Sequence, residues 1–546
     1  MRGQTILSRR QLLQVGAAGA LGGVLGWLGP PGYGASASVQ DRRPVPLGPG
    51  ARTEERAGAP SRAAWDALAC GLAGRLSRPG DPSYLADHEL YNPLFDGTHP
   101  AGVAFCASPS DVARTIVFAR QHGLALAVRS GRHSYGGYST TTGLVADVSA
   151  MSRVSVRGKA KAVVGAGAQL IDVYSVLSRQ GVSIPAGSCA TVGMAGLTLG
   201  GGIGVMDRLH GLTCDNLTDL ELVTAAGDVV RADAATNAEL FWACRGGGGG
   251  NFGVVTEMGF NTFPIGELAL FALDWPWPAA AQVLSAWLGW SSRAPDEMWS
   301  TCQLATVPGG PSPTVRVAGV WAGAPSGAAA HLARLTGAGP GAGASGAGTP
   351  TGQYLAPSSF EQAMYVEAGC QGLSEAACHI AGHYPGGTLP RSVEVAKSDI
   401  FVRPLSDPGV KAVLAGIEER QAASAPGAVI FDSWGGAVNR VAPRATAFVH
   451  RSAIASAQYI AMLPASASLG AVSSARAWLD AWYESLRPYA SGQAYQNYID
   501  PSLRDWARAY YGENLPRLGE VKAKWDPDDV WHFAQSIPLP KPESTD

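Results

Sequence analysis

Three glycine-rich segments hold most of the residues that could do chemistry in this chain of 546 amino acids. The first, residues 128–138, reads Val-Arg-Ser-Gly-Arg-His-Ser-Tyr-Gly-Gly-Tyr and directly follows a predicted strand. Backbone N–H groups, hydroxyls and two arginines in such a turn can bind a pyrophosphate. An ordinary glycine turn with a solvent-facing histidine explains the same residues, so both interpretations stay open.

The second segment has seven glycines between residues 187 and 204. Glycine costs roughly 0.5–1 kcal/mol relative to alanine inside a helix or strand, so we expect neither element there. The third has Arg245, five glycines at 246–250 and Asn-Phe-Gly-Val-Val at 251–255. A linker would explain these glycines too, but the β-branched residues that follow favour an ordered turn into a strand.

A dinucleotide fingerprint is the obvious alternative for these glycines. That motif needs Gly-x-Gly-x-x-Gly at a strand-to-helix turn and an acidic residue about 20 positions later. None of the three segments meets the full pattern, which argues against a Rossmann-type site.

The composition fits a globular protein with few charges. Glycine (70 residues) is nearly double its usual share of ~7%, yet glycine and proline together stay below the roughly 25–30% typical of disorder. Only 15% of residues are charged and the net charge is −2, without a run of basic residues. Collagen and wholesale disorder are therefore excluded, and nucleic acid is not expected as a partner.

The first 37 residues predict a twin-arginine export signal. Ser8, Arg9 and Arg10 precede an apolar stretch that ends near Leu28, and residues 35–37 read Ala-Ser-Ala. A membrane anchor is the alternative, but the apolar stretch has about 17 residues and many glycines, against the ~20 residues needed to span. We therefore expect a secreted or periplasmic protein without a permanent membrane anchor.

The periodicity of hydrophobic residues predicts the helices and strands that must position these segments. We predict strands at 101–104, 125–129, 144–147, 162–165 and 314–322, and helices at 110–122, 170–180, 504–510 and 515–524. Residues 337–352 are rich in alanine, glycine and proline and suggest a surface loop. The fold class is α+β.

The eight cysteines contain no Cys-x-x-Cys pair, so no metal site is predicted. Cys370 and Cys378 are close enough in sequence to form a disulfide in an oxidising compartment. Two unpaired buried thiols are equally compatible with the sequence.

Together the three segments resemble the berberine-bridge-enzyme-like branch of FAD-linked oxidases, whose FAD-binding domain is of the vanillyl-alcohol-oxidase (PCMH) type. The resemblance covers about residues 90–538 and includes the C-terminal stretch Tyr-Gln-Asn-Tyr-Ile-Asp at 495–500. It implies a bicovalent FAD, with His133 bonded to the flavin 8α-methyl and Cys189 bonded to flavin C6. The implied cofactor-binding residues are His133, Cys189, Arg129, Ser130, Gly131, Arg132, Ser134, Gly137, Gly187, Thr191, Val192, Gly193, Gly196, Gly200, Gly204, Gly250, Phe252, Gly253, Val255 and Asn497.

The resemblance also implies catalytic residues. Tyr498 matches the tyrosine that takes the substrate proton in relatives that oxidise sugars or alcohols, although a core tyrosine would look the same. Asp432, three residues before a Gly-Gly pair, matches an assisting carboxylate, and a buried cap or salt bridge is the alternative. Trp434 is a candidate for stacking on a sugar ring, and Lys397 and Arg440 are weaker candidates for electrostatic help.

Two departures from the family pattern and one further resemblance refine the activity. Ile203 stands where many relatives have an aromatic residue, which argues against a mechanism with two tyrosines. The glutamate base of the berberine bridge enzymes is not evident after Gly435-Gly436, so alcohol oxidation is favoured over oxidative ring closure. Val192 resembles members that admit oxygen to the flavin.

The sequence thus predicts a secreted FAD-dependent oxidase that acts on a CH–OH group of a carbohydrate, glycoside or secondary metabolite and reduces O₂ to H₂O₂. A dehydrogenase with another electron acceptor, a tailoring enzyme of natural-product biosynthesis and a binding protein without turnover are the alternatives. We expect two lobes: a PCMH-type FAD-binding domain, and an antiparallel-sheet substrate domain with helices on one face. The predicted divisions are 1–37 (signal), 38–90 (linker and N-terminal helix), 91–267 (FAD-binding domain), 268–487 (substrate domain) and 488–540 (C-terminal return to the FAD-binding domain).

Overall fold

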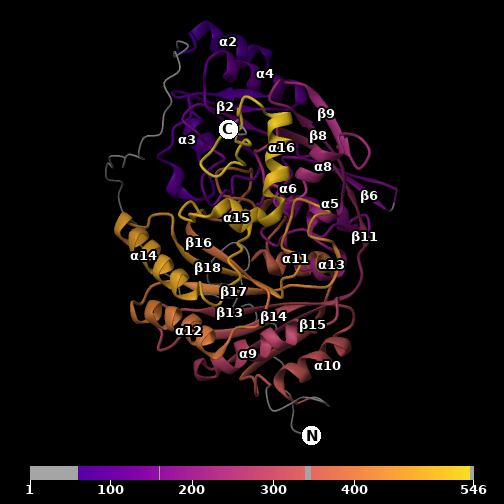
Figure 1. Ribbon diagram of the computed structural model, residues 1–546, viewed down its shortest axis with the longest axis vertical. Coiled ribbons are helices and arrows are strands. Elements are labelled where there is room, and N and C mark those ends of the chain that lie inside the picture. The colour runs from indigo at the N-terminus through magenta and orange to yellow at the C-terminus, as the bar shows by residue number, and fades with distance from the viewer. Residues whose placement is uncertain (1–58, 159, 339–345, 542–546) are drawn as a thin grey trace, which may run out of the picture.

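The computed structural model describes residues 59–158, 160–338 and 346–541. The predicted export signal lies outside the described residues, as does the centre of the alanine- and glycine-rich tract. The described residues form a mixed helix and sheet structure, and the predicted α+β class is confirmed. Three larger sheets dominate the described part of the chain, two in a first lobe and one in a second (Figure 1).

The first lobe begins with a four-stranded sheet. In spatial order its strands are β1 (Arg75–Ser77), β2 (Gly102–Phe105), β4 (Leu144–Asp147) and β3 (Leu126–Arg129), of which the last three run parallel. Helix α4 (Pro109–Gln121) connects β2 to β3. It begins at Pro109 because the Ser108 side chain accepts a hydrogen bond from the Asp111 backbone N–H, a cap worth about 1 kcal/mol.

A five-stranded antiparallel sheet completes the first lobe. Its strands, in order, are β5 (Val154–Arg157), β6 (Lys161–Gly165), β10 (Val254–Asn261), β8 (Leu217–Val223) and β9 (Val229–Asp233). The glycine-rich run 246–250 therefore leads into β10, as its β-branched residues predict. The helices of this lobe are α2 (Arg62–Gly71), α3 (Tyr84–His88), α5 (Leu170–Ser178), α6 (Met194–Leu199), α7 (Asp207–His210) and α8 (Ala238–Ala243).

Helix α6 corrects one expectation. The glycine content of residues 187–204 predicts neither helix nor strand, yet Met194–Leu199 is helical. Gly196 lies inside this short helix, whereas Gly193 and Gly200 lie at its two ends. Tertiary packing of Met194, Ala195 and Leu199 into the main core outweighs the cost of one helical glycine.

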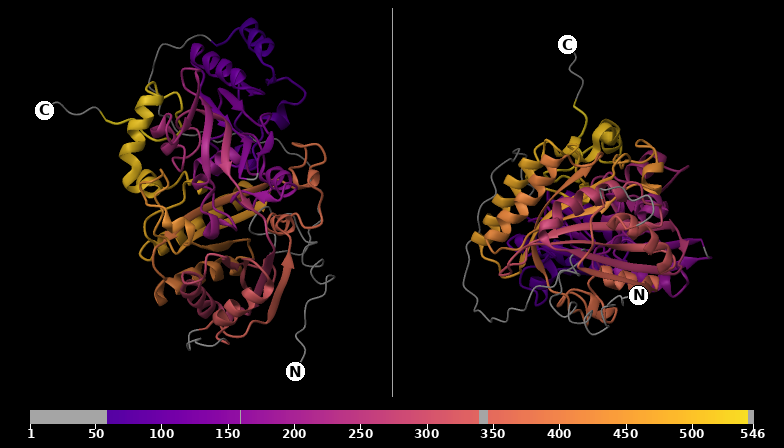
Figure 2. Two further views of the ribbon diagram at one scale, coloured as in Figure 1. Left: turned by 90° about the vertical axis from the view of Figure 1, so that its right-hand side faces the viewer. Right: turned by 90° about the horizontal axis from the view of Figure 1, so that it is seen from below.

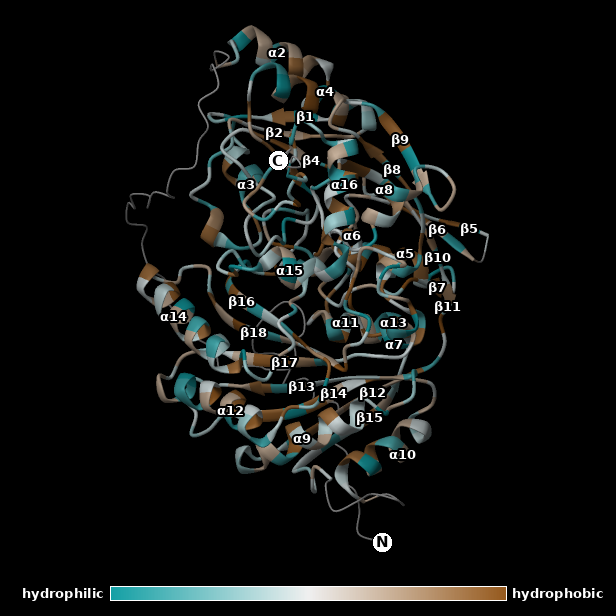
Figure 3. Ribbon diagram, viewed as in Figure 1, coloured by the Kyte–Doolittle hydropathy of each residue, from teal (hydrophilic) through white to brown (hydrophobic). Residues whose placement is uncertain are grey.

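The second lobe is a seven-stranded antiparallel sheet. Its strands, in order, are β15 (Gly352–Ser358), β12 (Leu268–Trp275), β14 (Thr314–Ala322), β13 (Met298–Ala305), β17 (Ala428–Ser433), β18 (Ala455–Pro464) and β16 (Ser392–Phe401). Helices α9 (Ala280–Ser291), α10 (Pro325–Thr336), α12 (Asp407–Ala422) and α14 (Leu469–Leu486) cover its outer face (Figure 1). These helices combine hydrophobic and hydrophilic residues along their length (Figure 3), as expected when only one side is buried. The other face is turned to the first lobe.

Shorter elements close the structure. Helices α11 (Phe360–Glu367) and α13 (Ala437–Arg440) follow β15 and β17, and β11 (Phe263–Pro264) pairs with β7 (Val182–Ser183). After α14 the chain returns to the first lobe as α15 (Trp506–Tyr511) and α16 (Leu515–Trp525), and Figure 2 shows α16 on the outer side of that lobe.

Cys370 and Cys378, whose pairing the sequence leaves open, form a disulfide. Within the described ranges, no helix combines the length and the apolar character needed to cross a bilayer.

Candidate active site

A cavity of about 550 Å³ lies between the glycine-rich loops of the first lobe and the inner face of the seven-stranded sheet. Its lining includes Gly249, Gly250 and Gly253 of the third glycine-rich segment and Tyr498 of the C-terminal return. Of the residues predicted to bind cofactor or substrate, the cavity brings together His133, Cys189, Ser130, Gly131, Arg132, Ser134, Gly187, Thr191, Val192, Gly193, Gly196, Gly250, Gly253, Val255, Asn497 and Tyr498. All three glycine-rich segments therefore contribute to one cavity. Arg129, Gly137, Gly200, Gly204, Phe252 and Asp432 do not line it.

His133 is held at the cavity wall by a ring and a hydroxyl. Its imidazole stacks on Tyr91, with ring centroids 4.2 Å apart, and its Nε2 lies 2.8 Å from the Thr191 Oγ1. Burial lowers the pKa of His133 to about 3, so the imidazole is neutral at pH 7. A neutral imidazole keeps the nitrogen lone pair that a covalent bond to a cofactor requires.

The loops that carry His133 and Cys189 touch backbone to backbone. A Cβ on Gly193 would overlap the Gly131 nitrogen and the Ser130 hydroxyl, and a Cβ on Gly131 would overlap the Gly193 nitrogen. Glycine at these positions therefore allows the two loops to contact each other directly. The same holds for Gly200 and Gly204, where a Cβ would overlap the Asn497 side chain and the Ala186 carbonyl.

Two arginines stabilise the His133 loop from behind. Arg129 is fully buried, pairs with Asp147 at 2.5 Å and donates to the Asp87 carbonyl at 2.6 Å. Burial favours the neutral acid, but Arg129 and Arg132 lower the pKa of Asp147 and keep it ionised. The predicted Arg129 thus acts on the loop through β4 and does not face the cavity.

Arg132 has a left-handed backbone conformation, with φ of 67°. Its guanidinium donates to the carbonyls of Ala86 (3.1 Å) and Glu89 (3.3 Å) and lies 2.7 Å from the His383 Nδ1. A non-glycine residue in this region costs about 1–3 kcal/mol. These contacts offset that cost and fix the backbone immediately before His133.

Tyr498 enters the cavity from the C-terminal return. It ends a single helical turn, Gln496–Tyr498, and its ring lies 5.6 Å from that of Tyr135 and 5.0 Å from that of Tyr495. The turn is anchored by Asn497, whose amide donates to the Leu197 carbonyl at 2.9 Å. Burial, with a smaller contribution from Asp432, raises the pKa of Tyr498 well above its usual value, so its phenol is protonated at pH 7.

Asp432 lies on β17 between Thr301 of β13 and Ser456 of β18. Its carboxylate accepts a long hydrogen bond from the Ser456 hydroxyl at 3.5 Å, and burial raises its pKa to about 7. It does not line the cavity itself, but its charge acts on the pKa of Tyr498. Asp432 and Tyr498 are therefore close enough to interact electrostatically.

Three further candidates lie away from the cavity. Trp434 is buried, stacks on Phe448 and does not line the cavity. Lys397 points to the helix side of the sheet, where it binds Asp500 at 2.8 Å. Arg440 pairs with Asp296 at 2.6 Å, with most of its side chain exposed. Their sequence positions carry no information about which face of the sheet each occupies.

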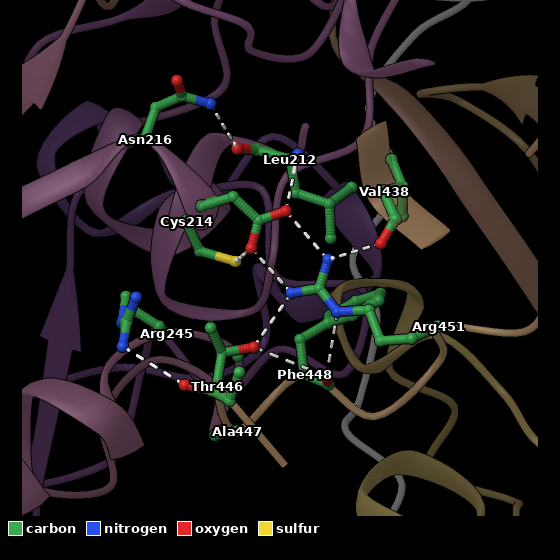
Figure 4. Close-up of polar contacts among 12 residues, drawn as sticks. Leu212, Cys214, Asn216, Arg245, Val438, Thr446, Ala447, Phe448 and Arg451 are labelled. Atoms are coloured by element: carbon green, nitrogen blue, oxygen red, sulfur yellow. Dashed lines mark hydrogen bonds and ion pairs between the residues drawn. The ribbon is translucent and has the colours of Figure 1, made fainter. Parts of the chain in front are cut away.

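A buried ion pair between Arg451 and Asp215 joins the lobes (Figure 4). The Arg451 guanidinium binds both carboxylate oxygens of Asp215, at 2.8 and 2.7 Å, and also the Val438 carbonyl. Asp215 lies just before β8 in the first lobe, whereas Arg451 lies just before β18. Burial and Asp215 raise the pKa of the adjacent Cys214 thiol well above its usual value, which makes this cysteine unreactive.

The sequence did not single out four residues that line the cavity: Tyr91, Tyr135, Glu394 and Gln458. Gln458 donates to the Tyr135 hydroxyl at 2.8 Å. Glu394 and Gln458 alternate with core residues along β16 and β18, and no local motif marks them. Tyr135 lies in the first glycine-rich segment, two residues after His133, and could have been found there.

Known proteins share both the sequence features and the fold. Residues 100–233 match the FAD binding domain family model, and residues 494–538 match the model for berberine and berberine-like proteins. The FAD-linked oxidoreductase YgaK of Bacillus subtilis is 33% identical over 476 residues, which is 86% of this chain and 97% of that protein. The chain belongs to the berberine-bridge-enzyme-like FAD-linked oxidoreductases.

Solved structures of this family superpose closely. BBE-like 1 from Physcomitrella patens has a TM-score of 0.78 at 30% identity, with 88% of this chain and all of that chain covered. A chitooligosaccharide oxidase has a TM-score of 0.76 at 25% identity, with the same shares covered. This FAD-linked oxidoreductase therefore has the family's flavin-binding architecture over nearly all of its described residues.

The cavity fits the flavin cofactor of this family. Its lining is mainly apolar and combines Gly249, Gly250 and Gly253 with the turn at 130–135 and with Tyr498. Its volume lies within the roughly 300–1,000 Å³ typical of small-molecule and cofactor sites.

The contact between the two loops predicts the effect of a single methyl group. We expect Gly193→Ala to lower the free energy of unfolding by about 1–3 kcal/mol, because the new Cβ forces the His133 and Cys189 loops apart. Urea denaturation followed by tryptophan fluorescence measures this loss. Gly97→Ala is the control, since its Cβ meets nothing within 4 Å, and equal stabilities of the two variants would contradict the prediction.

The ion pair under the Tyr498 turn predicts a larger effect. Lys397→Met leaves the buried Asp500 carboxylate without its cation, and breaking such a pair costs about 3–5 kcal/mol. The same denaturation experiment measures it, with Lys411→Met on the exposed side of α12 as the control. A loss below about 1 kcal/mol would show that Asp500 is satisfied without Lys397.

Proposed function

We propose that this FAD-linked oxidoreductase is an oxidase of CH–OH donors with a bicovalently bound FAD. The observation that carries the proposal is the meeting of His133, Cys189 and Tyr498 at one cavity. In the proposed reaction a secondary or hemiacetal alcohol loses a hydride and a proton to become a carbonyl, and O₂ takes up both electrons and two protons to become H₂O₂. The flavin supplies the hydride acceptor and passes the electrons to O₂.

His133 and Cys189 would each hold the flavin by one covalent bond. The neutral imidazole of His133 and the position of Cys189 on the adjoining loop support this proposal. Two attachment points on loops that touch each other would restrain the ring against rotation and translation, so that the hydride acceptor stays opposite the substrate carbon.

Tyr498 and Asp432 would move the substrate proton. Because its pKa is raised, the Tyr498 phenol is protonated at pH 7 and cannot accept the substrate proton as a phenolate. It can still form a hydrogen bond with the substrate hydroxyl. Asp432, with a pKa of about 7, is ionised in a large fraction of molecules near neutral pH. We therefore propose that Tyr498 contacts the substrate hydroxyl and that Asp432 provides the negative charge that draws the proton away.

The polar groups opposite the flavin loops favour a hydroxylated substrate. Gln458 and Glu394 line the sheet side of the cavity, and Gln458 binds the Tyr135 hydroxyl of the first glycine-rich segment, so the cavity offers both donors and acceptors. A structural neighbour at 25% identity is named for chitooligosaccharide oxidation, which supports a carbohydrate or glycoside. Val192 lines the same cavity, and its resemblance to oxygen-admitting members supports O₂ as the acceptor over another electron carrier.

Export across the membrane completes the proposal. The twin-arginine sequence at Arg9 and Arg10 supports it, and the Cys370–Cys378 disulfide is consistent with an oxidising compartment outside the cytoplasm.

The proposed covalent linkage predicts that the yellow flavin stays attached to the polypeptide after denaturation. The purified protein unfolded in acid should keep a yellow flavin on the polypeptide after gel filtration, and His133→Ala and Cys189→Ala should each keep it through the remaining bond. The double variant should release all of it. Cys70→Ala, a change at an exposed cysteine, is the control, and a wild-type protein that loses its flavin on denaturation would disprove the linkage.

The proton pathway predicts two distinct kinetic defects. Tyr498→Phe should retain the flavin, but the substrate should reduce this flavin at least about 100-fold more slowly than in the wild type. This loss lies within the 10²–10⁴-fold range of general acid–base catalysis. Tyr489→Phe, on the helix side of the sheet, should be normal. In the wild type the reduction rate should rise with pH through about 7 as Asp432 loses its proton.

Asp432→Asn should abolish that rise. Anaerobic stopped-flow absorbance measures both defects, and an oxygen electrode shows whether O₂ is consumed. An unchanged pH profile in Asp432→Asn would exclude Asp432 as the titrating group.

A further inference from the structure

Glu394 is a carboxylate on the inner face of the seven-stranded sheet. It lies on β16 opposite Met462 of β18, and its neighbours Val393 and Val395 belong to the helix-side core. Side chains alternate along a strand, so Glu394 points to the cavity, where it is part of the lining. Only 8% of the residue is exposed.

Nothing basic in the described structure neutralises this carboxylate. Among the ion pairs formed by residues 59–158, 160–338 and 346–541, none includes Glu394. The basic residues near it in sequence are engaged elsewhere: Arg391 binds Glu89 and Asp96, and Lys397 binds Asp480 and Asp500. The hydroxyls of Tyr91 and Tyr135 lie close enough for the Glu394 carboxylate to raise the pKa of both, and burial raises the pKa of this carboxyl to about 7.

The apolar surroundings of Glu394 raise the free-energy cost of an unpaired carboxylate charge. Ile460 and Met462 of β18 and Ile430 of β17 line the cavity on the same face. Removing a carboxylate from water without a compensating partner costs several kcal/mol. A cation delivered by the ligand would recover this energy, whereas a neutral hydroxyl would recover only part of it.

The distance between Tyr498 and Glu394 suits a substrate whose charged substituent is remote from the oxidised carbon. Gln458, which binds Tyr135 beside Tyr498, lies four residues before Met462 on β18. Four residues of strand span about 13 Å, roughly the reach of a sugar with a short substituent. A substrate with its hydroxyl at Tyr498 could therefore place a substituent at Glu394.

We propose that Glu394 binds a protonated amine of the substrate, so that the enzyme prefers alcohols, such as aminoalkyl glycosides or amino sugars, that carry a cation away from the oxidised carbon. The location of the reacting end rests on the proposed function, but the ion pair itself can be tested by binding alone.

The test uses the flavin-loaded enzyme and two matched probes, 2-aminoethyl β-D-glucoside and 2-hydroxyethyl β-D-glucoside. Titration calorimetry measures the affinity of each probe. At about pH 8 the alkyl amine is charged and most of Glu394 is ionised. We expect the amine to bind at least tenfold more tightly than the hydroxyl probe. Glu394→Gln should remove this preference and keep the flavin content, whereas Glu484→Gln, at an exposed position on α14, should keep the preference.

Equal affinities of the two probes for the wild type, or no binding of either, overturn the inference, and so does a preference that survives in Glu394→Gln. The wild-type comparison holds even where the variant fails to fold. Flavin bleaching by the same probes separates this inference from the proposed function. A charge preference without bleaching supports the amine site and counts against alcohol oxidation. Bleaching by both probes at equal affinity supports alcohol oxidation and overturns the amine site.

Discussion

The backbone contact between Gly131 and Gly193 is the constraint on which the candidate active site depends. It brings two loops from distant parts of the chain so close together that neither position accepts a Cβ. One loop carries His133 two residues later, and the other carries Cys189 four residues earlier. A cofactor with two fixed attachment points requires loops whose separation does not fluctuate, and direct contact between main chains leaves less freedom than contact between flexible side chains.

Charged groups around the cavity reinforce this contact. Arg129 and Asp147 lock the ends of β3 and β4, and Arg132 pays for a left-handed backbone with bonds to two carbonyls. Lys397 and Asp500 do the same for the turn that carries Tyr498. Each of these cations therefore helps to hold the main chain in position. Arg129 and Lys397 do not line the cavity, whereas Arg132 does, with its guanidinium bound to two carbonyls and His383.

The sequence predicted the local elements well because their signals are local. The strands at 144–147 and 314–322 have the predicted bounds, and the helices at 110–122 and 515–524 are displaced by only one residue. The glycine-rich segments also identified which loops would meet. The sequence could not predict which face of the sheet a residue occupies, since that depends on strand register across the lobes. Glu394 and Gln458 were missed for this reason, and Lys397 lies on the helix side of the sheet, away from the cavity.

The buried carboxyls of the inner sheet face bear on the proposed alcohol oxidation. Asp432 and Glu394 are buried carboxyls with pKa values raised to about 7, and the arginines and lysine discussed above are neutralised elsewhere. Loss of hydride from an alcohol leaves positive charge on the carbon and its hydroxyl. A fixed carboxylate close to that charge stabilises the transition state more than the ground state, because the charge develops only as the hydride leaves. A buried carboxylate that acts on Tyr498, such as Asp432, is thus the electrostatic arrangement that would favour the proposed hydride transfer.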